Sequence, residues 1–180
     1  MSDRSRLIEL LLERSIQHGD FLLASGRHST HYIDARRTTM SAEGLALVGR
    51  LGLSAIRDAG WFPDAIGGLT LGADPVAYAI AAASSIDPPT IDAFTIRKEP
   101  KKHGAGRQVE GNLERGHRVV VVEDVITTGN SARRAIAVVE EAGASVLGVL
   151  GVVDRLGGGR ESLEADGRTV VVVTTSNDLG

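Results

Sequence analysis

The chain reads VVVVEDVITTGNS from Val119 to Ser131, and this stretch decides the fold class. Four consecutive valines without polar alternation are typical of a strand that is buried on both faces of a sheet. Two acids and a short turn follow, and then a segment with helical apolar spacing continues to Gly143. A strand, a turn and a helix in this order predict one unit of a mostly parallel α/β sheet.

The same alternation continues on both sides of this unit. Further strands are expected at residues 64–69, 91–96, 146–153 and 170–174. Helices are expected from about Leu7 to near Gly19, and at residues 41–59, 75–84 and 131–142. Residues 99–116 are the longest expected loop, and residues 20–37 are polar with a short extended piece at Tyr32-Ile33. The pattern predicts one α/β domain over residues 1–180, with a mostly parallel central sheet flanked by helices.

The composition limits the function classes. The chain has 180 residues, 42% hydrophobic and 24% charged, which is ordinary for a globular domain with a real core. A net charge of −3 gives no general attraction for nucleic acid or an anionic membrane. The lack of cysteine excludes disulfides, thiolate metal sites and a cysteine nucleophile. No apolar run is long enough to cross a bilayer and the first residues lack a signal-peptide core, so a cytoplasmic location is expected.

The lysines are confined to one short segment. The chain has 20 lysines and arginines, but the lysines are only Lys98, Lys101 and Lys102. A general preference for arginine explains the surface, but it does not explain why every lysine falls within five residues. Lysine supplies a compact, mobile charge that the rigid guanidinium cannot copy. The segment around Lys98 is therefore a candidate for chemistry.

The turn after the valine run is a candidate phosphate site. Ligands of open α/β sheets bind beyond the carboxyl ends of the strands, where a helix N-terminus presents free N–H groups to an anion. Gly129 allows close approach of the backbone, and the hydroxyls of Thr127, Thr128 and Ser131 can add hydrogen bonds. The chain contains neither a Walker A motif nor GxGxxG, which disfavours a nucleoside triphosphate or a dinucleotide.

Two acids, Glu123 and Asp124, stand at the start of this turn. They could accept hydrogen bonds from neighbouring sugar hydroxyls, or contact Mg²⁺, a hard cation that prefers oxygen ligands. Taken alone, an acid pair more often just solvates the end of a strand. The whole unit from Val119 to Ser131 is what favours a phosphorylated sugar.

Residues 119–131 resemble the phosphoribosyl-pyrophosphate signature of the type I phosphoribosyltransferases, and the resemblance covers nearly the whole chain. It is closest to the members that use orotate. It implies the fold of that family, with residues 1–37 contributing a small hood over the base site. In the family the two acids meet the ribose hydroxyls and the following loop surrounds the 5-phosphate. By this match the sugar-phosphate site comprises Glu123, Asp124, Val125, Ile126, Thr127, Thr128, Gly129, Asn130 and Ser131.

Residues 94–104, FTIRKEPKKHG, resemble the RKxxKxHG segment of the same enzymes. The resemblance implies that Arg97, Lys98, Lys101 and His103 bind the pyrophosphate, and that Lys101 and His103 act in catalysis together with Asp124. Mobile cations can neutralise the charge of a departing pyrophosphate. A solvated basic loop is the plainer alternative. A nucleic-acid patch is disfavoured because the segment lacks interleaved aromatic residues.

The base is expected near the end of the next strand. Arg155 matches an arginine that contacts orotate in the family, and Thr127 matches the other orotate contact. A guanidinium can hold a carboxylate through two hydrogen bonds; the plainer alternative is that Arg155 only pairs with Asp154. Residues 67–75 match the family's pyrophosphate loop. Ala24 and Leu71 stand where some relatives carry lysine.

The resemblance implies a transfer of ribose 5-phosphate from phosphoribosyl pyrophosphate to orotate, giving orotidine 5′-phosphate and pyrophosphate in pyrimidine synthesis. It further implies Mg²⁺ held mainly by the substrate's pyrophosphate, with Asp124 as a candidate protein contact, and a homodimer with sites shared between chains. Neither nucleic acid nor a membrane is expected as a partner. Two alternatives stay open: a phosphoribosyltransferase for a purine or uracil, and a non-catalytic regulator that binds phosphoribosyl pyrophosphate.

Overall fold

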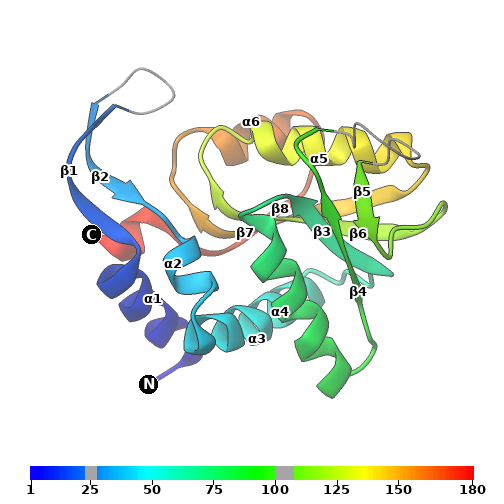
Figure 1. Ribbon diagram of the computed structural model, residues 1–180, viewed down its shortest axis with the longest axis horizontal. Coiled ribbons are helices and arrows are strands. Elements are labelled where there is room, and N and C mark those ends of the chain that lie inside the picture. Colours follow the sequence, from blue (N-terminus) through cyan, green and yellow to red (C-terminus); the bar gives the residue numbers. More distant parts are fainter. Residues whose placement is uncertain (23–27, 100–107) are drawn as a thin grey trace.

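The computed structural model describes residues 1–22, 28–99 and 108–180 (Figure 1). The helices are α1 (Asp3–Arg14), α2 (Arg36–Thr39), α3 (Ala42–Asp58), α4 (Ala73–Ile86), α5 (Asn130–Glu141), α6 (Gly159–Ala165) and the 3-10 helix η1 (Ser176–Leu179). The strands are β1 (Ile16–Leu22), β2 (His28–Ile33), β3 (Ala65–Leu69), β4 (Asp92–Ile96), β5 (Val109–Gly111), β6 (Arg118–Ile126), β7 (Ser145–Asp154) and β8 (Val170–Thr175).

Six strands form the central sheet in the order β5-β4-β3-β6-β7-β8. All neighbours pair in parallel except β4 and β5, which are antiparallel. From β3 the chain adds strands outward in one direction, and from β6 it adds them in the other. The boundary between β3 and β6 is therefore the switch point of the sheet, where the loops at the carboxyl ends diverge and leave room for a ligand.

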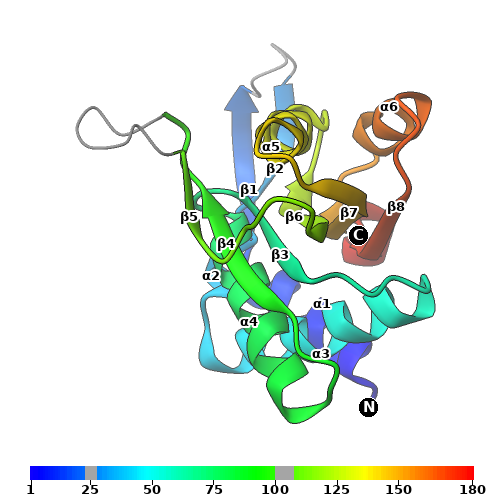
Figure 2. The same cartoon turned by 90° about the vertical axis from the view of Figure 1, so that its right-hand side faces the viewer.

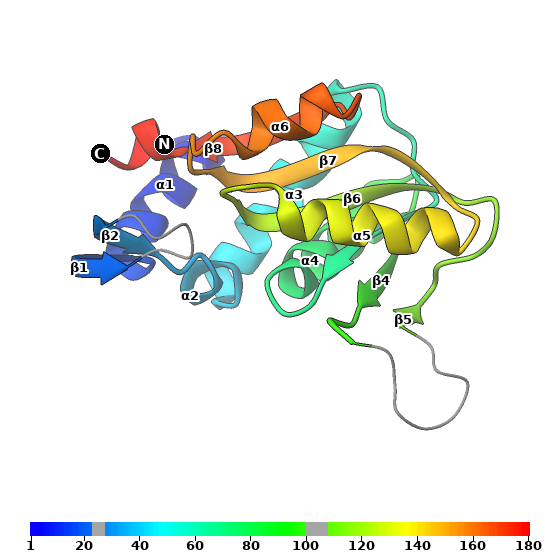
Figure 3. The ribbon, with the colours of Figure 1, turned by 90° about the horizontal axis from the view of Figure 1, so that it is seen from above.

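Helices cover both faces of the sheet. Helices α1, α3 and α4 lie on one face, and α5 and α6 lie on the other (Figures 1 and 3). The valine run of β6 is fully buried and serves both layers. Val120 and Val122 belong to the apolar cluster on the α3–α4 side, whereas Val119 and Val121 belong to the cluster on the α5 side. The strand buried on both faces is thus confirmed.

The N-terminal part has two components. Leu7, Leu10 and Leu11 of α1 are fully buried and belong to the same apolar cluster as the α3–α4 face. Strands β1 and β2 form a separate antiparallel two-stranded sheet, which projects from the body of the molecule (Figures 1 and 2). A cap formed by all of residues 1–37 is therefore too simple, because α1 is part of the core. The hood over the base site stays a prediction.

The α/β class and the mostly parallel sheet are confirmed, and some boundaries differ. Helix α1 ends at Arg14 rather than near Gly19, because the chain turns at the buried Ser15 into β1, which begins at Ile16. The hairpin of β1 and β2 replaces the short extended piece, and β5 lies inside the expected loop. Helix α6 was not expected. No helix in the described ranges combines the length and apolar character needed to cross a membrane.

Candidate active site

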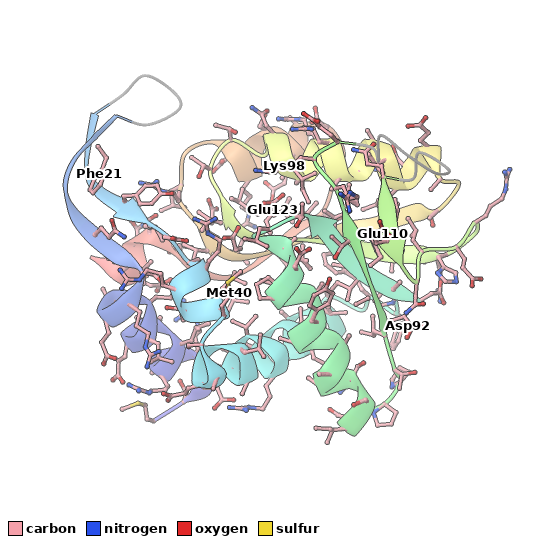
Figure 4. The ribbon with its side chains drawn as sticks, in the orientation of Figure 1. Phe21, Met40, Asp92, Lys98, Glu110 and Glu123 are labelled. Carbon is pink, nitrogen blue, oxygen red and sulfur yellow. The ribbon has the colours of Figure 1, made fainter. Side chains whose placement is uncertain are left out.

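A cavity of about 340 Å³ opens at the carboxyl edge of the sheet, beside the switch point between β3 and β6. Loops after β3, β4, β6 and β7 meet the end of β2 there. Figure 4 shows Glu123 near the centre of the view and Lys98 just above it. Asp92 lies at the opposite end of β4 from Lys98. The cavity is lined by Tyr32, Ile33, Asp34, Arg36, Leu69, Thr70, Leu71, Gly72, Lys98, Glu123, Asp124, Val125, Thr127, Ser131 and Arg155.

Glu123 is the most unusual acid of the cavity. It is only 7% exposed, and within the described residues its Oε1 has no hydrogen-bond partner. Burial, and secondly the neighbouring Asp124 carboxylate, raise the pKa of Glu123 from 4.5 to about 8. A buried polar oxygen without a partner is costly, so it marks a place where a ligand can supply the missing hydrogen bond.

Asp124 is held differently. Its Oδ1 accepts a hydrogen bond from the Val125 N–H at 2.9 Å. Burial raises its pKa, while that backbone hydrogen bond and the Arg36 guanidinium oppose the rise. Arg36 is itself fixed by Asp34, through Nε to Oδ1 at 2.7 Å and NH2 to Oδ2 at 3.2 Å. Asp34 and Arg36 therefore bring a fixed cation to the acid pair. The sequence does not predict that Arg36 lies near the acid pair, because residues 1–37 are expected only as a hood over the base site.

The phosphate loop runs from β6 into α5. Gly129 precedes the helix with φ +75°, a left-handed conformation that suits glycine, and α5 begins at Asn130. Arg133, in the first turn of α5, donates to the Thr128 carbonyl at 3.3 Å and to Asp166 Oδ2 at 2.6 Å. These hydrogen bonds tie the loop to the segment that follows α6. The loop ends at the N-terminus of α5, where the first N–H groups of a helix can bind an anion.

The loop after β3 closes the cavity from the other side. The Thr70–Leu71 peptide is cis, and Gly72 immediately precedes α4. A Cβ built on Gly72 would lie 2.3 Å from Asp124 Oδ1, so the backbone of this loop touches the acid pair. Leu71 is exposed and lines the cavity.

The lysine segment is described up to Glu99. Lys98 lines the cavity, and its carbonyl accepts a hydrogen bond from Arg134 NH2 of α5 at 2.9 Å. Arg97 lies 3.6 Å from Glu110 and lines a neighbouring cavity of about 450 Å³ that shares Thr70 and Lys98. The candidates Lys101 and His103 lie outside the described residues.

The structure brings seven of the twelve described candidate residues together. In the cavity it places Lys98, Glu123, Asp124, Val125, Thr127, Ser131 and Arg155. The predicted residues that do not line it are Arg97, Ile126, Thr128, Gly129 and Asn130. Ile126 is instead a core residue with 1% exposure, so its side chain supports the loop. Thr70 also lines the cavity. It lies in the expected pyrophosphate loop of residues 67–75, but it was not singled out as a site residue.

Arg155 begins the loop after β7. Its N–H donates to the Ile126 carbonyl at 2.9 Å, which fixes this loop beside the phosphate loop. The preceding Asp154 is buried, and its Oδ1 accepts a hydrogen bond from the Leu156 N–H at 2.8 Å. Arg155 lines the same cavity as Tyr32 and Thr127.

The comparisons agree with this geometry. Residues 40–177 match the family model described as a phosphoribosyl transferase domain. The orotate phosphoribosyltransferase of Aquifex aeolicus is 47% identical over 93% of this chain and 92% of its own length. A crystal structure of the Mycobacterium tuberculosis orotate phosphoribosyltransferase with Fe(III) dicitrate aligns with a TM-score of 0.88 and 46% identity over 99% of both chains.

A second structure of the Mycobacterium tuberculosis enzyme is a complex with 5-phospho-α-D-ribosyl 1-diphosphate. It aligns with a TM-score of 0.81 and 40% identity over 99% of this chain and 92% of that one. The matched domain covers more than half of the chain, and the relatives match over nearly their full length. The chain belongs to the phosphoribosyltransferase family, in its orotate phosphoribosyltransferase branch.

Proposed function

We propose that the chain transfers ribose 5-phosphate from phosphoribosyl pyrophosphate to orotate, with release of pyrophosphate. The observation that carries this proposal is the meeting of an acid pair, a helix-start phosphate loop, Lys98 and Arg155 around one cavity at the switch point of the sheet. Each group matches one part of the reactants. The similarity to orotate phosphoribosyltransferases over nearly the full chain supports orotate as the base.

The sugar phosphate is held by the acids and the loop after them. Glu123 and Asp124 accept hydrogen bonds from the ribose hydroxyls, and the unpartnered Oε1 of Glu123 gains a partner in this way. The N–H groups at the start of α5, with the hydroxyls of Thr127 and Ser131, hold the 5-phosphate. These contacts fix the ribose with its reacting carbon toward the base.

The base and the leaving group lie on opposite sides of that ribose. Arg155 holds the orotate carboxylate through two parallel hydrogen bonds, and Thr127 adds a further contact. Arg97, Lys98, Lys101 and His103 neutralise the charge that develops on the pyrophosphate. The transition state resembles an oxocarbenium ion, so positioning and charge stabilisation supply the rate and no covalent nucleophile is required. An ionised Asp124 beside the ribose would favour the sugar cation.

We propose Mg²⁺ as the cofactor, bound mainly by the substrate's pyrophosphate and contacted on the protein by Asp124. The donor set fits: the carboxylate oxygens of Asp124 are hard ligands, and Mg²⁺ usually takes one or two carboxylates with substrate phosphate and water. Among the described residues no group of three or more acids and histidines is arranged to hold a metal. The ion supplies charge neutralisation on the leaving group. The reaction class also leads us to propose a cytoplasmic location.

The test is an absorbance assay for orotate loss, with and without phosphoribosyl pyrophosphate and Mg²⁺. We expect turnover that needs all three components. Lys101→Ala should lower kcat by about 100-fold or more, because Lys101 acts on the developing charge, while its neighbour Lys102→Ala serves as the matched control and should change kcat less than about twofold.

Three results would contradict the proposal. Turnover with hypoxanthine or uracil but not orotate would assign the chain to another base. Tight binding of phosphoribosyl pyrophosphate without any turnover would indicate a regulator. A Lys101→Ala change confined to KM would show that this lysine acts in binding alone.

A further inference from the structure

Asp74 sits at the centre of a hydrogen-bond network beside the cavity. It lies in the first turn of α4, and both of its carboxylate oxygens are used. Thr70 Oγ1 donates to Oδ2 at 2.6 Å, and Thr95 Oγ1 donates to Oδ1 at 2.9 Å. Tyr78 OH lies 2.6 Å from Thr95 Oγ1. Because the single Thr95 proton goes to Asp74, the Tyr78 hydroxyl must be the donor in that last contact.

The network joins two chain segments that belong to different sides of the cavity. Thr70 starts the loop after β3, whose Gly72 lies against Asp124. Thr95 belongs to β4, two residues before Arg97, where the lysine segment begins. The Thr70 N–H also donates to the Ile96 carbonyl at 2.8 Å, so the two segments are joined by backbone as well. Asp74 itself lines neither of the two cavities.

We propose that Asp74 is a positioning residue that fixes the loop from Thr70 to Gly72 relative to the end of β4 that carries Arg97 and Lys98. It thereby sets the width of the part of the site that receives the pyrophosphate group. This inference rests on the proposed phosphoribosyl transfer. A carboxylate suits the role because it is an acceptor only, with two oxygens that can receive both threonine hydroxyls at once.

The competing explanation is that Asp74 only stabilises α4. An acid in the first turn of a helix interacts favourably with the helix dipole, and its loss lowers stability without touching the ligand. The two explanations differ in their kinetics. A purely structural role changes the melting temperature and the fraction of active enzyme, whereas a positioning role changes the Michaelis constant for one substrate selectively.

The experiment compares Asp74→Ala and Asp74→Asn with the wild type. We expect Asp74→Ala to raise KM for phosphoribosyl pyrophosphate by about tenfold, with KM for orotate changed less than about twofold. Asp74→Asn keeps one acceptor oxygen and an amide that can donate to a threonine oxygen, so it should restore part of the loss. Calorimetric titration of phosphoribosyl pyrophosphate without orotate should show the same order of affinities.

Two further variants test the hydrogen bond from Thr95 and provide a control. Thr95→Val keeps the shape but removes the hydroxyl, and it should raise the same KM by a smaller factor. Adding it to Asp74→Ala should cost little more, because the contact is already lost. Glu43→Ala is the matched control, since Glu43 is a first-turn acid of α3 that does not line the cavity. It should alter the melting temperature without altering either KM.

The proposal is overturned if Asp74→Ala shifts both Michaelis constants equally, or if it lowers only the melting temperature as Glu43→Ala does. A failure of the proposed function would look different. In that case the wild-type chain itself would not consume orotate, whereas calorimetry with phosphoribosyl pyrophosphate would still report whether Asp74 shapes the site.

Discussion

At the scale of single residues, Glu123 carries an energetic cost that the fold does not remove. It follows the four buried valines within β6, it is almost completely buried, and within the described chain one of its oxygens has no partner. Its neighbour Asp124 accepts a backbone hydrogen bond and lies near the Arg36 cation. For Glu123, burial instead favours the protonated form of the side chain. Adjacent acids therefore have different surroundings, which composition alone would not reveal.

This difference predicts the pH dependence of stability. The folded-state pKa of Glu123 is about 8, against an ordinary value of 4.5 in the unfolded chain. The folded protein therefore binds the extra proton between these values, so this group's contribution to the free energy of unfolding is complete below about pH 4.5 and is lost as the pH rises through about 8. Glu123→Gln removes that loss, because an amide never ionises.

We expect Glu123→Gln to melt at least about 3 °C above the wild type at pH 9, with the gap closing as the pH falls toward 5. Thermal unfolding of both proteins across this pH range is the measurement. Glu141→Gln, which changes an exposed acid at the end of α5, is the control and should give a constant difference. A gap for Glu123→Gln that is equally large at pH 5 would contradict the assigned pKa.

At the scale of elements, the site is made where loops from separate strands touch. The loop after β3 and the end of β6 approach so closely that a Cβ on Gly72 would lie 2.3 Å from the Asp124 carboxylate. The backbone of the loop after β3 is held in place between the acid pair on one side and the network of Asp74 on the other.

Gly72→Ala tests this contact. The added Cβ would lie 2.3 Å from Asp124 Oδ1, so either the Asp124 carboxylate or the loop has to shift. We expect KM for phosphoribosyl pyrophosphate to rise by about tenfold or more. Gly116→Ala is the control, because it strains a backbone with φ +88° where nothing lies within 4 Å of the new Cβ. It should lower stability by ~1 kcal/mol and leave both Michaelis constants intact; an unchanged KM in Gly72→Ala would refute the contact.

At the scale of the whole molecule, Lys101 and His103 lie outside the described residues, and we propose that they complete the site beside Lys98. The homodimer with shared sites, which the family resemblance implies, would deliver Lys101 from the partner chain. This arrangement makes a prediction for mixtures of inactive variants. Lys101→Ala and Asp124→Asn should each be inactive, since they damage different parts of the same site.

Refolding the two variants together at equal amounts should restore about a quarter of the wild-type activity, because about half of the dimers are mixed and each mixed dimer holds one intact site of two. Mixing either variant with itself is the control. If Lys101 served its own chain's site, every site in the mixture would carry one defect, and no activity would return.

Much of the fold could be predicted because its signals are local. Strands β3, β4, β6, β7 and β8 are apolar runs, and α3, α4 and α5 carry apolar spacing with clear ends. The missed elements lack such signals. The hairpin of β1 and β2 is largely polar, β5 has three residues, and α6 follows a run of glycines. Their existence depends on what they pack against.

The site was predictable where one motif carries it. The acid pair, Thr127 and Ser131 lie in a continuous stretch, and the structure places all of them at the cavity. The cation of Arg36 was not predictable, because its meaning lies in its distance from an acid 88 positions away in the sequence. Asp74 was passed over for the same reason: Thr70 and Thr95 become its partners only once β3 and β4 lie side by side.

The alternation of Val119 to Val122 between two apolar layers has a consequence for assembly of the sheet. If the strand slipped by one position, the four identical valine side chains would fill either layer equally well. The slip would, however, move Glu123 and Asp124 each to the other face of the sheet, and the site would lose its acid pair. Correct alignment must therefore be encoded outside the valines. Two contacts favour the aligned strand over a slipped one. The Arg118 N–H donates to Asp64 Oδ2 at 2.7 Å, and Gly68 packs against the Val122 carbonyl.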